Sequence, residues 1–212
     1  MSVRTEARHR RDAAGTTGRA EGNERLTAMT GMVLLVLLAA EGVTILFKGR
    51  LLTEHFFIGM LLIGPVLLKM SSTSYRFVRY YTGSAPYVRK GPPALLLRLL
   101  GPVVIATSVG VIGSGIALAL VGPGPSPWLF LHKATFILWF GAMSIHVLWY
   151  APRLPRLLSS RSAGWDRARV TLAGAGRRWI LLTAALAVGL AAALATYHLA
   201  GNWTSFMART GG

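Results

Sequence analysis

Three histidines within apolar stretches of the sequence are the residues best suited to chemistry. Imidazole can ligate a metal, carry a proton or donate and accept hydrogen bonds. His55 stands near the start of the second apolar stretch, and His132 stands near the start of the fourth. If both stretches are helices that cross a membrane in the same direction, the two imidazoles lie at a similar depth. We therefore expect them to be able to ligate one group together.

A second level of candidates lies fourteen residues further along both stretches. His146 follows His132 by fourteen residues, which returns it to within about 40° of the same helix face and about 21 Å further along. Fourteen residues after His55 stands Lys69, with Met70 beside it. One face of the fourth helix would thus offer two imidazoles, which is the spacing that two stacked cofactors require.

The third apolar stretch carries two glycines with the same spacing, Gly101 and Gly115. A glycine opposite a flat macrocycle lets the ring approach the helix backbone. Gly110 and Gly113 also occur in this stretch, so one such spacing arises easily by chance.

Each polar residue also has an interpretation without chemistry. The histidines near helix ends could sit among lipid headgroups, and His146 could only hydrogen-bond a neighbouring helix. Lys69 could extend its amine to the nearer membrane surface. Glu41, in the first stretch, is expected to pair with Lys48 or Arg50, and a role in a proton path is the alternative. The sequence assigns no role to His9 or His198.

The elements that would hold these residues are five apolar segments. The chain has 212 residues, of which 53% are hydrophobic and only 14% charged, well below a soluble domain. Each segment is long enough to cross a hydrocarbon core of about 30 Å as a helix. We predict an all-α, polytopic membrane bundle, with a disordered basic tail at 1–27 and a short extracytoplasmic tail at 200–212. The predicted helices are 28–47, 51–72, 99–121, 129–150 and 179–199.

The distribution of basic residues predicts the orientation. The tail 1–27 and the loops 73–98 and 152–178 together hold eighteen Lys and Arg, whereas the opposite side holds four, Lys48, Arg50, Lys133 and Arg209. Positive loops remain in the cytoplasm, so the N-terminus is predicted inside and His55 and His132 near the outer surface.

Composition narrows the function classes. The net charge of +16 would suit nucleic acid, but the basic residues lie between apolar segments. We therefore expect contacts with anionic lipids and no nucleic acid. The chain has no cysteine, which excludes disulfides and thiolate ligands from it. No phosphate-binding glycine loop, HExxH or nucleophile elbow is found, so no hydrolase or transferase is indicated.

The histidine set resembles a known family. His132 and His146 on the fourth helix, His55 at matching depth on the second and glycines on the third resemble the four-helix di-haem core of cytochrome b and cytochrome b561-like membrane proteins. The resemblance covers residues 28–150. In that family, helices two and four ligate two b-type haems that carry electrons across the membrane. It implies that His55 and His132 ligate an outer haem b, with Lys48, Arg50 and Lys133 near its propionates.

The inner site departs from the family pattern. His146 would ligate an inner haem, but Lys69 stands where its second histidine belongs. A deprotonated lysine or Met70 could replace that histidine, since Met/His ligation of haem is known. One outer haem is the simpler expectation.

The sequence leaves three functions open. The first is an electron-transfer protein of the bacterial plasma membrane that works with a redox partner protein, as the resemblance implies. The second is a cofactor-free scaffold or accessory subunit. The third is a transporter component, for which a helix break at Gly64–Pro65 is the only indication.

Overall fold

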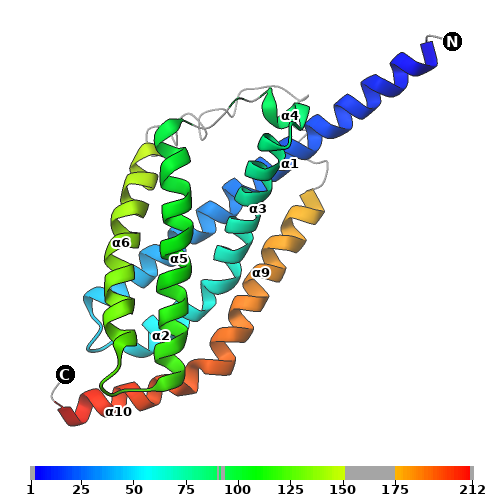
Figure 1. Cartoon of the computed structure of the whole chain (residues 1–212). Coiled ribbons are helices and arrows are strands. Elements are labelled where there is room, and N and C mark those ends of the chain that lie inside the picture. The colour runs from blue at the N-terminus through cyan, green and yellow to red at the C-terminus, as the bar shows by residue number, and fades with distance from the viewer. Residues whose placement is uncertain (1–2, 90, 92–93, 151–174, 211–212) are drawn as a thin grey trace.

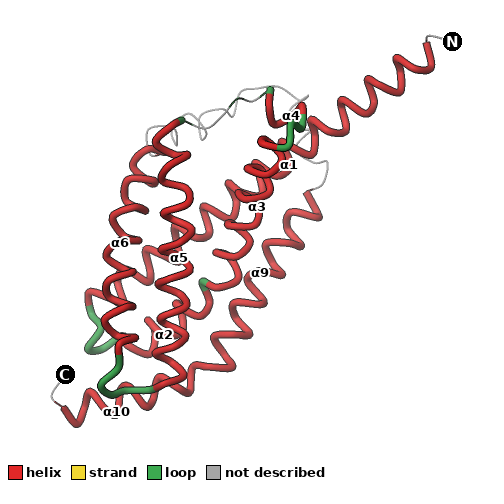
Figure 2. The backbone as a smooth tube through the Cα atoms, in the orientation of Figure 1, coloured by secondary structure: helices red, strands yellow, loops and turns green. Residues whose placement is uncertain are grey.

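The computed structural model describes residues 3–89, 91, 94–150 and 175–210, with side chains from residue 20 onward. All regular structure in this part of the chain is helical (Figures 1 and 2). The elements are α1 (Val3–Leu46), α2 (Leu52–Leu61), α3 (Ile63–Tyr81), α4 (Ala85–Val88), α5 (Leu95–Val121), α6 (Pro127–Tyr150), α9 (Ala175–Thr196), the 3₁₀ turn η3 (Tyr197–Leu199) and α10 (Ala200–Thr210).

Within the described residues, five helical stretches are long and apolar enough to cross a membrane, as predicted. They are Ala20–Leu46, Leu52–Tyr81, Leu95–Val121, Pro127–Tyr150 and Ala175–Thr210. Many of their large apolar side chains are exposed on the surface of the isolated chain. Such an apolar exterior is expected where lipid replaces water around the bundle.

The N-terminal segment differs from the predicted disordered tail. α1 is one helix from Val3, and its side chains pack against α3 well before residue 28. Ala20 and Leu26 are buried, and Asn23 donates a hydrogen bond to the carbonyl of Ser72 at 3.0 Å. Since α3 itself continues beyond the predicted helix end, it supplies a surface on which residues 20–27 can pack.

The second predicted helix is two helices that meet at Leu62. α2 ends at Leu61 and α3 continues to Tyr81, nine residues beyond the predicted end. Pro65 has no backbone N–H, so it cannot bond the carbonyl of Leu61 within the helix. The break therefore lies one turn before the proline. The predicted loop 73–98 contains the end of α3, α4 and the start of α5.

The C-terminal segment is also helical rather than an extended tail. The fifth predicted helix ends at Thr196, where η3 turns the chain into α10. Figure 1 shows α10 lying across the end of the bundle below α5. Trp203, Phe206 and Met207 are its half-buried face, and they recur at the spacing of one helix side. Most of the predicted basic loop 152–178 lies outside the described residues.

The helices form two groups. α5 and α6 pack along each other, while α1, α2, α3 and α9 form the other group. Between α5 and α6, Gly110 leaves room for Thr135, and the Trp139 indole donates to Ser108 at 3.0 Å. Small residues at such contacts let helices approach closely where no water drives them together.

α9 holds to α2 and α3 through two glycines. A Cβ on Gly64 would overlap the carbonyl oxygen of Ala185, and one on Gly189 would overlap that of Leu61. The Leu61 carbonyl is the one that Pro65 leaves without its helical donor. Close packing of Gly189 on it therefore covers a polar group that lipid could not satisfy.

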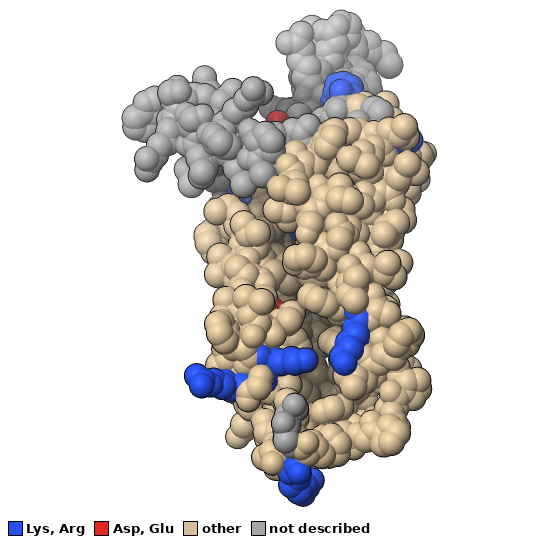
Figure 3. All heavy atoms as spheres, turned by 90° about the vertical axis from the view of Figure 1, so that its left-hand side faces the viewer, with Lys and Arg blue, Asp and Glu red and all other residues tan. Residues whose placement is uncertain are grey.

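The two groups meet near α2 and diverge toward the other end of the bundle (Figure 1). Met60 of α2, Ala119 of α5 and Ala193 of α9 form a small core at the meeting point, with Phe56, Ile116 and others around it. Figure 3 shows a hollow along one face of the molecule, with basic side chains on both sides of its lower part. The candidate site spans the two groups.

Candidate functional site between the two helix groups

His55 lies in the first turns of α2 and is anchored to α1. Its Nδ1 lies 2.8 Å from Oε1 of Glu41, whose side chain is 12% exposed. A carboxylate only accepts hydrogen bonds, so Nδ1 is the donor, and in a neutral imidazole the lone pair is then on Nε2. Thr44 Oγ1 lies 3.1 Å from the same Nδ1 and donates to the Glu41 backbone carbonyl at 2.6 Å. The imidazole is therefore fixed in both orientation and tautomer.

His132 is anchored in the same way to α5. Its Nδ1 lies 3.0 Å from the carbonyl oxygen of Val111 and 3.2 Å from the hydroxyl of Ser114. That hydroxyl donates to the carbonyl of Gly110 at 2.6 Å. Because a carbonyl can only accept, Nδ1 of His132 also carries the proton, and its Nε2 is again the free nitrogen.

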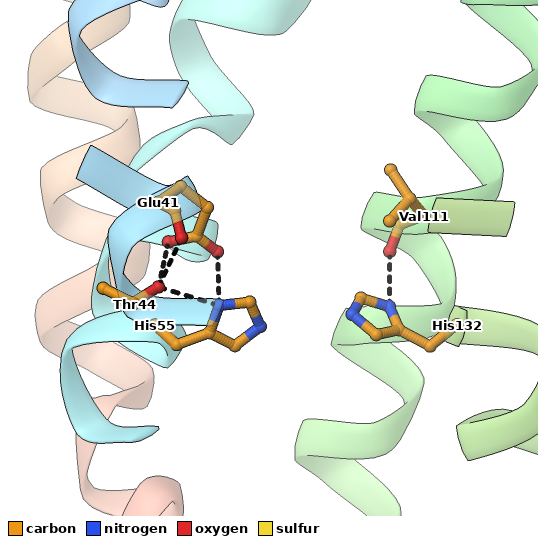
Figure 4. Close-up of polar contacts among 5 residues, drawn as sticks. All are labelled: Glu41, Thr44, His55, Val111 and His132. Carbon is orange, nitrogen blue, oxygen red and sulfur yellow. Dashed lines mark hydrogen bonds and ion pairs between the residues drawn. The ribbon is translucent and has the colours of Figure 1, made fainter. Parts of the chain in front are cut away.

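The two free nitrogens face each other across the space between the helix groups (Figure 4). The centres of the two rings are 6.4 Å apart, and their planes are inclined by 76°. A metal between two imidazole nitrogens, with bonds of about 2.0–2.1 Å, places ring centres roughly 6–6.5 Å apart. The observed separation therefore fits one metal atom bound by both Nε2 atoms.

The partners of Nδ1 have the character of a metal site. A histidine that binds a metal through one nitrogen almost always donates its other N–H to a carboxylate, carbonyl or water. Glu41 and the Val111 carbonyl provide these two acceptors. Thr44, Val111 and Ser114 were not among the residues predicted from the sequence. For Val111 no signal existed, because any residue supplies a backbone carbonyl.

The number of protein ligands distinguishes a site for a bare metal ion from a site for a metal that a macrocycle already holds. Zinc sites take three or four protein ligands. Within the described residues, no group of three or more His, Cys, Asp or Glu side chains is placed to hold a metal. Two imidazoles on opposite sides suit a metal that already has four ligands in a plane, as haem iron has.

The two candidate glycines of α5, Gly101 and Gly115, have different surroundings from each other. A Cβ on Gly115 would lie 3.2 Å from Cε1 of His132, so this glycine makes room for the imidazole itself. Gly101 faces open space, and its proposed role beside a macrocycle stays a prediction.

Glu41 does not pair with Lys48 or Arg50, contrary to the prediction. It pairs with His55, whereas the two basic residues lie exposed in the turn after α1. Lys48 and Arg50, seven and nine residues after Glu41, suggested a local partner, but the carboxylate lies toward α2, beside Gly59. Lys133 is likewise exposed at this end of the bundle.

The inner candidates lie on two helices, α3 and α6. Lys69 donates to the carbonyl of Thr27 at 2.6 Å, so its amine bridges α3 to α1 rather than reaching water. His146 is half-buried and lies against Tyr150, with ring centres 5.1 Å apart. Met70 is half-buried beside Lys69. This end thus offers one imidazole and an amine that is already engaged.

No protein-family model, curated protein or solved structure matches this chain.

Proposed function

We propose that this protein is a multi-pass membrane protein that transfers electrons through a b-type haem held between His55 and His132. The observation that carries this proposal is the opposition of two free Nε2 atoms at the separation of a bis-imidazole metal site. Each histidine has an acceptor on Nδ1, and the two come from different helix groups.

The chain's own residues would hold, orient and shield the group. His55 and His132 would hold the group, and Glu41 and the Val111 carbonyl would keep both imidazole rings in place. Exposed Lys48, Arg50 and Lys133 supply positive charge at this end for acidic substituents of the macrocycle. When bound, haem supplies reversible one-electron chemistry, which no side chain in this cluster provides.

The membrane setting completes the proposal. From the basic tail and loops we infer a cytoplasmic N-terminus, which would put the histidine pair toward the outer surface of a bacterial plasma membrane. Anionic lipids contact the basic inner face, and a redox partner protein exchanges electrons with the site. A single outer haem is proposed, because Lys69 is already bound to Thr27 at the inner end.

The deciding experiment is an absorption spectrum of the detergent-purified protein from haem-replete cells, oxidised and then reduced with dithionite. A Soret band with sharp α and β bands on reduction is expected, at one haem per chain by pyridine haemochrome assay. His132→Ala should lose these bands, whereas His198→Ala, an exposed histidine at the same end, should keep them. A colourless wild-type protein, or an unchanged spectrum in His132→Ala, would refute the proposal.

The cofactor-free scaffold remains the competing function, and the same experiment separates the two. A scaffold would be colourless, and its histidines would contact each other edge to face as packing residues. The stoichiometry also tests the inner end. Two haems per chain, with one lost in His146→Ala, would assign a second site to His146.

A further inference from the structure

The two imidazoles of the candidate site differ in the group that accepts their Nδ1–H. His132 donates to the neutral carbonyl of Val111 at 3.0 Å. His55 faces a carboxylate, Oε1 of Glu41, at 2.8 Å. A carboxylate attracts the Nδ1 proton more strongly than a carbonyl does, so it makes Nε2 of His55 the more basic of the two nitrogens.

The carboxylate of Glu41 is held against His55 and is largely buried. Its side chain is 12% exposed, and its other oxygen, Oε2, lies 3.3 Å from the hydroxyl of Thr44. On α2, Gly59 lies one turn beyond His55 beside the carboxylate, where a Cβ would stand 3.5 Å from Oε1, at ordinary contact distance. Besides His55, the nearest ionisable groups along the chain are Lys48 and Arg50, which are both exposed.

We propose that Glu41 is a positioning residue that sets the redox equilibrium of the haem through His55. This inference rests on the proposed function. A more basic axial imidazole, backed by a negative charge in a low-dielectric setting, stabilises the oxidised iron relative to the reduced iron. Glu41 thereby lowers the midpoint potential and favours electron release to an acceptor. No bond to Glu41 forms or breaks when one electron enters or leaves.

The test is redox potentiometry of the purified full-length protein at one fixed neutral pH, with an electrode and mediators supplying the electron. Glu41→Gln keeps the size and the hydrogen-bond acceptor but removes the charge. We expect its equilibrium to shift at least about tenfold toward the reduced state, which is about +59 mV for one electron. Glu41→Asp keeps the charge but withdraws it by one methylene, so its potential should lie between wild type and Glu41→Gln.

Glu54→Gln is the matched control, because it makes the same substitution at an exposed carboxylate in the first turn of α2 and leaves Glu41 in place. Its potential should stay close to that of wild type. An unchanged potential in Glu41→Gln, or an equal rise in Glu54→Gln, would overturn the inference while leaving the haem itself established. If Glu41→Gln binds no haem, the potential of Glu41→Asp is the test. A Glu41→Asp potential equal to that of wild type would also overturn the inference. Failure of the proposed function is distinct, since it would show as a colourless wild-type protein.

Discussion

Replacement of Gly115 by alanine tests whether His132 is held as the structure describes. The added Cβ would lie 3.2 Å from Cε1 and 3.5 Å from Nδ1 of His132. The first distance is tighter than ordinary contact, so the ring must move by a few tenths of an ångström. That movement acts directly on the 3.0 Å hydrogen bond from Nδ1 to the Val111 carbonyl.

The size of the effect follows from that hydrogen bond. Its loss costs about 0.5–1.5 kcal/mol, and hydrogen bonds between membrane helices average about 0.6 kcal/mol. Since about 1.4 kcal/mol corresponds to tenfold in affinity, haem should bind roughly 3- to 10-fold more weakly.

The assay is the rate of haem transfer from the purified protein to an excess of apomyoglobin, followed at the Soret band. Gly101→Ala is the matched control, because it makes the same substitution in the same helix where nothing lies within 4 Å. Both variants gain the same helix propensity, about 1 kcal/mol over glycine, so their difference reports the contact alone. Equal transfer rates in the two variants would refute the described position of His132.

Three further outcomes are expected. Gly189→Ala should lower the thermal midpoint in detergent, by an amount that corresponds to about 2–3 kcal/mol of overpacking, because the new Cβ would overlap the backbone carbonyl of Leu61. Gly141→Ala, whose Cβ would have nothing within 4 Å, should leave the midpoint unchanged. Equal midpoints in the two variants would contradict the described packing of α9. Lys69→Met should leave the haem content unchanged and lower the stability by about 0.6–1.7 kcal/mol, because it removes the hydrogen bond from Lys69 to α1. Loss of haem in this variant would instead show that Lys69 is a ligand. The chain has no cysteine, so a maleimide that cannot cross membranes should label Ser126→Cys but not Ser84→Cys in intact cells; the reverse labelling would invert the orientation.

The helical ends show why local patterns gave approximate boundaries. Hydropathy marks where a helix is apolar, but α3 continues to Tyr81 through residues that are polar enough to lie outside the lipid. Residues 20–27 likewise form part of a packed helix because α3 extends far enough to receive them. In both cases tertiary contact, rather than composition, determines how far the helix extends.

In the candidate site, too, some features follow from the sequence and others depend on tertiary packing. The sequence placed His55 and His132 at one depth, since helix rise and direction depend only on position along the chain. It could not assign Glu41 to His55, because the rotation of α1 against α2 is set by side-chain packing between the two helices. No residue pattern could predict that the Val111 carbonyl accepts the hydrogen bond of His132, because every residue has a backbone carbonyl.

The sequence by itself determined that this chain has five apolar helices and that three histidines lie within them. These are local properties, because the lipid core requires a fixed length of apolar helix regardless of its neighbours. Only the tertiary structure decided that α5 and α6 form one group, that α9 joins α2 and α3 through Gly64 and Gly189, and that two free imidazole nitrogens face each other between the groups. Those features depend on how helices rotate and approach one another, which is settled by contacts between residues far apart in the chain.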